Sequence, residues 1–102
     1  MDFNDYQEQA EGYVLPTADA IYVFSNLVAE VGELFGKVAK NQRDGPTFTA
    51  EDMAKEVGDI LWHLAIISNR LGYSMNDVAQ MNLDKLASRK ERGVLGGSGD
   101  DR

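Results

Sequence analysis

Cysteine is absent from the 102-residue chain. Without it there is no disulfide framework, no thiolate metal site and no cysteine nucleophile. The N-terminus is acidic, and no stretch reaches the roughly 18 apolar residues of a membrane-spanning helix. We therefore expect a cytoplasmic protein without a membrane partner.

Basic residues are also scarce. The chain has 10 lysines and arginines against 17 acidic residues, which gives a formal net charge of -7. No basic face is large enough to follow a nucleic-acid backbone, so we expect no nucleic-acid partner. A chain of this length suggests a single domain with a modest core and much exposed surface, which dimerisation would help to cover.

The apolar periodicity predicts an all-α protein, an antiparallel helical bundle of about four helices. A short helix is expected over about 3–12, and a long one over about 17–43 with Thr17 as its N-cap and Asp19 in its first turn. The third helix is expected over about 50–71, capped by Thr47 or Thr49. Gly72 ends it, and the fourth helix follows Ser74 over about 75–92.

Two apolar seams are expected to face the core. The seam of the second helix comprises Ile21, Phe24, Val28, Val31, Phe35 and Val38. The broad apolar face of the third helix comprises Met53, Val57, Ile60, Leu61, Leu64, Ile67 and Leu71, and Trp62, Ala65 and Ile66 widen it. A helix that is apolar on more than one side is buried on more than one side. The third helix is therefore predicted to lie at a subunit interface, so that the chain oligomerises through its central helices.

Two pairs of carboxylates repeat the pattern Glu-Val-Gly-acid. They are Glu30 with Glu33 and Glu56 with Asp59. The i, i+3 spacing places both members of a pair on one helix face. Four carboxylates brought together repel one another unless a cation lies among them, and oxygen ligands suit Mg²⁺ or Mn²⁺.

The two pairs are expected to lie level with each other. The first pair is centred about 11 residues before its helix ends, and the second about 8 residues after its helix begins. An α-helix rises roughly 1.5 Å per residue. Across an antiparallel hairpin their heights then differ by only about 5 Å. Gly32, Gly36 and Gly58, beside the acids, are consistent with close helix approach or with room for a ligand. The sequence therefore favours a metal site over a solvated acidic face.

Residues 1–92 are expected to form one domain, and residues 93–102 a glycine-rich tail. From composition alone a disordered tail is expected.

With these features the chain resembles the MazG family of nucleoside triphosphate pyrophosphohydrolases over about residues 20–92. The family motif is E-E-x-x-E on one helix and E-x-x-D on the next. It corresponds here to residues 29–33 and 56–59, and the flanking GEL and GDIL also match. Ala29 departs from the motif because many members carry another glutamate there, so a fifth carboxylate is missing.

The resemblance implies that Glu30, Glu33, Glu56 and Asp59 bind Mg²⁺, with Mn²⁺ as an alternative. Water would attack the α-phosphorus of a nucleoside triphosphate and release a nucleoside monophosphate and pyrophosphate. One of the outer acids would accept the proton of the water, and Glu33 is the candidate, although the sequence does not decide which. The family also implies house-cleaning of surplus or non-standard nucleotides and a homodimer or tetramer.

The triphosphate would also need cations. Lys37 and Lys40 lie one and two turns beyond Glu33. The resemblance extends to the family's N-x-x-K element, which Asn82 and Lys85 match. Arg89 lies on the same face of that helix, and an ordinary solvated stripe explains all three equally well.

His63 matches the position that lines the base pocket in related enzymes. A partly buried structural histidine is an equally good interpretation. Asn26, on the polar stripe that carries the first pair of acids, is expected to lie on a solvated face. The tail resembles that of some small phage and bacterial members, in which case Gly96 to Gly99 would cover the phosphates with N–H groups and Arg102 would add charge.

Two other protein classes compete with this interpretation. A di-iron carboxylate bundle needs Glu-x-x-His on two helices, and the chain has a single histidine. A non-catalytic helical interaction module explains the wide apolar faces without a ligand, and it predicts no dependence on Mg²⁺.

Overall fold

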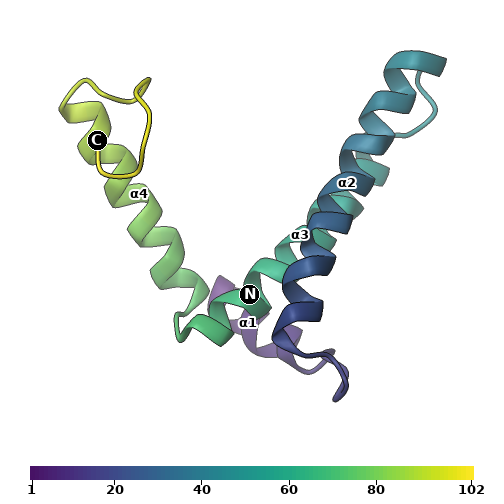
Figure 1. Ribbon diagram of the computed structural model, residues 1–102, viewed down its shortest axis with the longest axis horizontal. Helices are drawn as coiled ribbons and strands as arrows, with labels where there is room; N and C mark the ends of the chain where they lie inside the picture. Colours follow the sequence, from purple (N-terminus) through teal and green to yellow (C-terminus); the bar gives the residue numbers. More distant parts are fainter.

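The computed structural model describes residues 1–102 as four helices without strands, which confirms the all-α prediction (Figure 1). The helices are α1 (Phe3–Glu11), α2 (Ala20–Asp44), α3 (Ala50–Leu71) and α4 (Met75–Glu91). None is long and apolar enough to cross a membrane.

A side-chain cap begins each of the four helices. Thr49 caps α3, and its hydroxyl oxygen accepts from the backbone N–H of Asp52 at 3.1 Å. Gly72 ends α3 at φ 83°, in the left-handed region that favours glycine. Ser74 caps α4 as predicted.

The predicted cap of α2 was wrong. Asp19, rather than Thr17, is the N-cap, because its carboxylate accepts from the N–H of Tyr22 at 2.8 Å. The preceding residues form a turn, in which the N–H of Ala18 donates to the carbonyl of Leu15 at 2.9 Å. The helix therefore begins later than the apolar pattern indicated.

The helices form a V rather than a closed bundle (Figure 1). One arm is the antiparallel hairpin of α2 and α3, and the other is α4 with the C-terminal tail. Helix α1 lies at the base, where it packs against α3 and α4. Helix α2 packs against α3 alone and does not contact α4.

The small core lies where α1, α2, α3 and the start of α4 meet. Its buried apolar residues are Ala10, Val23, Ala65, Ile66 and Met75. Gln7 is buried beside them and ties α1 to the α3–α4 connection. The Nε1 of Trp62 donates to the carbonyl of Ala10 at 3.1 Å, so the indole is both a filler and a hydrogen-bond donor. The base of the V thus holds the apolar core of the chain.

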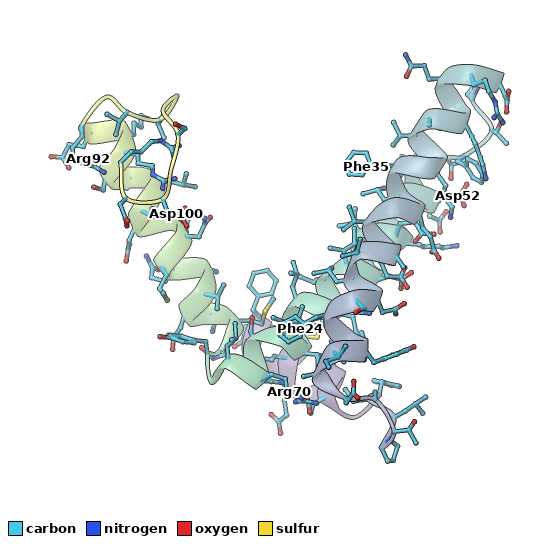
Figure 2. The ribbon with its side chains drawn as sticks, in the orientation of Figure 1. Phe24, Phe35, Asp52, Arg70, Arg92 and Asp100 are labelled. Carbon is cyan, nitrogen blue, oxygen red and sulfur yellow. The ribbon has the colours of Figure 1, made fainter.

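The prediction that the α2 seam faces the core of this chain was wrong. Val28 is 74% exposed and Phe35 is 62% exposed. Figure 2 shows Phe35 projecting from α2 toward the opening of the V. Parts of the α3 and α4 apolar faces are also exposed, including Val57, Leu71 and Met81. The physical reason is that α2 has one neighbouring helix, which covers only one of its sides.

Candidate metal centre

Three of the four predicted ligands meet between α2 and α3. Carboxylate oxygens of Glu30, Glu33 and Glu56 lie within 4.8 Å of one another. Asp59 lies one turn along α3 from Glu56, outside this group, but it is close enough for its charge to raise the pKa of Glu30. Glu56 is buried, Glu30 is half-buried, and Glu33 and Asp59 are exposed. The acids therefore form a cluster with a buried floor and an open rim.

The electrostatics of this cluster are unfavourable without a cation. Burial, and then the charges of Glu33 and Asp59, raise the pKa of Glu30. One carboxylate oxygen of Glu30 and one of Glu56, both Oε2, are buried without a hydrogen-bond partner. Unpaired buried oxygens are costly, and hard divalent cations prefer such ligands. The donor set therefore fits Mg²⁺ or Mn²⁺.

Lys37 neutralises part of the cluster from within. Its Nζ lies 2.6 Å from Oε1 of Glu56 and 5.4 Å from the centre of the Phe48 ring. The hydrogen bond to Glu56 raises the pKa of Lys37, so the ammonium stays charged beside the acids. Lys40, one turn further, is exposed. Of the two lysines, the fold brings Lys37 directly to the cluster.

His63 is buried beside the acids and has both ring nitrogens paired. Its Nδ1 lies 2.7 Å from the carbonyl of Asp59 and its Nε2 lies 3.0 Å from Nδ2 of Asn26. Because a carbonyl only accepts, these partners assign the proton to Nδ1 and leave Nε2 to accept from Asn26. The edge of Trp62 packs against the ring, with centroids 4.9 Å apart.

Asn26 is the residue near the site that sequence reasoning missed. The sequence predicts it on a solvated face, but it is half-buried and fixes His63. The signal that could have found it is its position one turn before Glu30 on the stripe that carries the acids.

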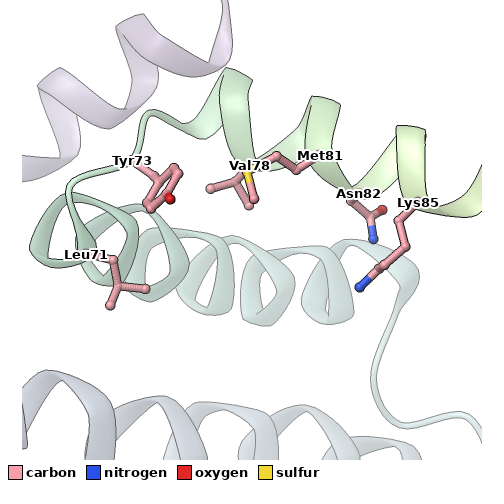
Figure 3. Close-up of a pocket in the computed structure, with 6 residues that line it drawn as sticks. All are labelled: Leu71, Tyr73, Val78, Met81, Asn82 and Lys85. Carbon is pink, nitrogen blue, oxygen red and sulfur yellow. The ribbon is translucent and has the colours of Figure 1, made fainter. Parts of the chain in front are cut away.

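The α4 residues lie on the other arm of the V. Asn82 and Lys85 line an open groove of about 450 Å³ together with Leu71, Tyr73, Val78 and Met81 (Figure 3). Arg89 is buried under the tail, where Nη2 donates to the carbonyl of Asp100 at 2.8 Å. Within one chain, the fold therefore does not bring these three residues to the carboxylates.

The tail differs from the disordered segment that its composition predicts. The guanidinium of Arg102 donates to the carbonyls of Val94 and Leu95 at 3.0 and 3.1 Å. Arg92, the C-cap of α4, donates to the carbonyl of Arg102 at 2.6 Å. The glycine content of the tail predicts disorder, but it does not reveal that arginine side chains donate hydrogen bonds to the tail carbonyls. Arg102 thus lies in contacts within the tail.

The glycines beside the acids do not mark close helix packing within the chain. A methyl group built on Gly32, Gly36 or Gly58 would meet no atom within 4 Å. Of the two explanations that the sequence allowed, close helix approach is wrong within one chain, and room for a ligand stays a prediction.

Comparisons with known proteins bear on this site. A model of the MazG nucleotide pyrophosphohydrolase domain matches residues 21–94, a range that includes all four acids. The chain is also similar to the gene 37 protein of Mycobacterium phage L5, with 46% identity over 85 residues that cover 79% of this chain and 75% of that protein. No solved structure gives a significant match.

Proposed function

The chain belongs to the MazG nucleotide pyrophosphohydrolase family, and we propose that it cleaves nucleoside triphosphates to nucleoside monophosphates and pyrophosphate with a divalent metal. The observation that carries this proposal is the pair of buried, unpartnered carboxylate oxygens on Glu30 and Glu56. A role in removing surplus or non-standard deoxynucleotides follows by analogy with the family.

Glu30, Glu33, Glu56 and Asp59 would hold Mg²⁺, with Mn²⁺ as the alternative. In such sites the bound metal supplies an acidified water and neutralises charge on phosphate oxygens. Glu33 lies at the open rim, so it is the proposed acceptor of the proton that the attacking water loses. Lys37, held on Glu56, keeps one positive charge of the protein beside the phosphates.

The buried His63–Asn26 pair would contact the nucleotide from the floor next to the acids. Because Nε2 of His63 accepts from Asn26, the imidazole ring and the Asn26 amide hold each other in one orientation. The exposed Lys40 and the α4 residues Asn82, Lys85 and Arg89 are proposed phosphate contacts. Since α4 diverges from the acids of its own chain, the α4 residues would serve the site of a second copy.

The reaction is tested by identifying the products formed from each common and several modified nucleoside triphosphates, with Mg²⁺ or with EDTA. We expect monophosphate and pyrophosphate with Mg²⁺ and no turnover with EDTA. Release of orthophosphate would show that the water attacks a phosphorus other than the α-phosphorus. No turnover with any nucleotide would favour the second candidate, a non-catalytic helical oligomerisation module.

We also propose that the protein is a homodimer or a dimer of dimers. The accessible surface of the chain is 7304 Å². The usual scaling of surface with mass gives a compact monomer of this size about 5700 Å², so the excess is about 1600 Å². The radius of gyration is 16.5 Å, against about 13 Å for a compact domain of this length. An excess of this size matches what one subunit buries in an obligate interface.

The apolar seam of α2 and its counterpart on α3 would form that interface. Both were predicted to face a core, and within one chain they are exposed at Val28, Phe35 and Val57. A second hairpin laid against the first would complete a four-helix core, which is how bundles bury such stripes.

Light scattering should therefore give a mass of at least twice the 11.3 kDa of one chain. Val28→Glu should dissociate the oligomer, because it places a charge at the centre of the buried seam. Tyr13→Glu is the matched control, since Tyr13 is equally exposed but lies outside both seams. A stable monomer of the unmodified protein would overturn this proposal, as would an oligomer that Val28→Glu leaves intact.

A further inference from the structure

The C-terminal tail brings a carboxylate to two cations of α4. Oδ1 of Asp100 lies 3.3 Å from Nζ of Lys85 and 3.5 Å from Nη2 of Arg89. The same Nη2 also donates to the backbone carbonyls of Gly99 and Asp100, at 3.4 and 2.8 Å. Figure 2 shows Asp100 in the tail where it folds back along α4. Lys85 and Arg89 are thus arranged around a single anionic group.

The two cations and their anion differ sharply in exposure. Arg89 is 5% exposed, and its Nε is buried with no hydrogen-bond partner. The Asp100 side chain is 86% exposed. Lys85, and then Arg89, lower the pKa of Asp100, so its carboxylate remains charged. The site is therefore built into α4, whereas its anion reaches it from the solvent side on a short tail.

The Lys85–Asp100 pair is exposed on both sides, and the Asp100 carboxylate is also the exposed member of its pair with Arg89. Exposed pairs contribute little because water and salt compete with them. A phosphate group carries more charge than a carboxylate and offers more acceptor oxygens, so it binds such a pair of cations more tightly. Asp100 thus holds a position that suits a phosphate.

We propose that Lys85 and Arg89 form a phosphate-binding site that Asp100 fills until a polyphosphate displaces it. The ligand class is a nucleoside triphosphate or pyrophosphate, and in this respect the inference rests on the proposed function. The tail then acts as an intramolecular competitor of substrate or product.

The construction of the tail supports its release as a unit. Arg102 holds the carbonyls of Val94 and Leu95, so the turn keeps its shape without α4. Beyond the backbone hydrogen bond from Val94 to Arg89 that continues the chain from the helix end, the tail is attached by the contacts of Lys85 with Asp100, of Arg89 with Gly99 and Asp100, and of Arg92 with the last carbonyl. Gly93 follows the end of the helix with a positive φ, and a glycine there gives the tail a flexible connection.

The test is the affinity for inorganic pyrophosphate, measured by calorimetry in EDTA so that metal at the acidic cluster plays no part. Asp100→Asn should lower the dissociation constant roughly two- to fivefold, the range that corresponds to one exposed ion pair. Asp101→Asn is the matched control, because it removes the same charge from a neighbouring position for which no contact is present. Lys85→Met should weaken binding and abolish the effect of Asp100→Asn.

Three results would overturn the proposal. They are equal effects of Asp100→Asn and Asp101→Asn, weaker binding by Asp100→Asn, and no measurable pyrophosphate binding by either Asp100→Asn or the unmodified protein. The outcome is separate from that of the proposed reaction. If the protein hydrolyses no nucleotide but Asp100→Asn tightens pyrophosphate binding, the proposed anion site stands and the proposed reaction is wrong. If the protein hydrolyses nucleotides but Asp100→Asn leaves pyrophosphate binding unchanged, the proposed reaction stands and the role of Asp100 as a competitor is wrong.

Discussion

Glu33→Gln and Asp59→Asn are each expected to lower the turnover of nucleoside triphosphates by at least roughly 100-fold. Mutation of a residue that only hydrogen-bonds to a metal ligand already lowers metal affinity or activity by about 10–100-fold. Each change keeps the size of the side chain and removes one negative charge from the proposed metal site. Glu33 also lies where the attacking water would lose its proton, so its loss affects two steps. The measurement is the turnover number at saturating Mg²⁺ and nucleotide.

The fold should survive both substitutions. Glu33 and Asp59 are exposed, and their charges raise the pKa of Glu30, so without metal they repel it rather than stabilise the fold. Circular dichroism and the mass in solution should therefore match those of the unmodified protein. Glu51→Gln, an exposed acid in the first turn of α3, is the control and should retain its activity. Retained turnover in both Glu33→Gln and Asp59→Asn would reject the site.

Gln7→Ala should lower the free energy of unfolding by about 2–4 kcal/mol, because it leaves the buried N–H of Met75 and the partly buried carbonyl of Tyr73 without their side-chain partner. Gln7 Nε2 donates to the carbonyl of Tyr73 at 3.0 Å, with a longer contact of 3.4 Å to that of Ala65. Its Oε1 accepts from the N–H of Met75 at 2.8 Å. One side chain thus closes the junction of α1, α3 and α4.

Urea titration at a fixed protein concentration measures this loss, since association would otherwise change the apparent stability. Gln9→Ala is the matched control in the same helix. Gln9 is exposed, and its side chain makes one weak contact of 3.9 Å to the sulfur of Met1. Equal destabilisation by both substitutions would show that α1 loses helix stability in general and that Gln7 has no special role.

The position of Gln7 also bears on the proposed site. Its Oε1 accepts from the N–H of Met75 at the start of α4, so Gln7 is one of the contacts that hold the connection between the two arms. Sequence reasoning placed no role on Gln7, because a single buried glutamine in a short helix resembles any exposed one.

Features of this chain that depend on residues close together in the sequence were predictable from it. The caps at Gly72 and Ser74 were predicted, and Thr49 was one of two candidates, because each cap acts on backbone groups within a few residues. The meeting of Glu30, Glu33 and Glu56 was predictable for a related reason. Helical spacing fixes the face, and a short antiparallel turn fixes the height.

The sequence by itself determined the four helices, their order and the faces that carry the acids, because these follow from the period of the helix and from local caps. Only the tertiary structure decided that the α2 seam is exposed, that Asn26 holds His63, that Arg89 of α4 is buried under the tail, and that Arg102 makes contacts within the tail. Periodicity identifies a face that must be covered, but the partner that covers it depends on the angles between helices. Those angles are set by contacts between residues far apart in the chain, such as Gln7 with Met75.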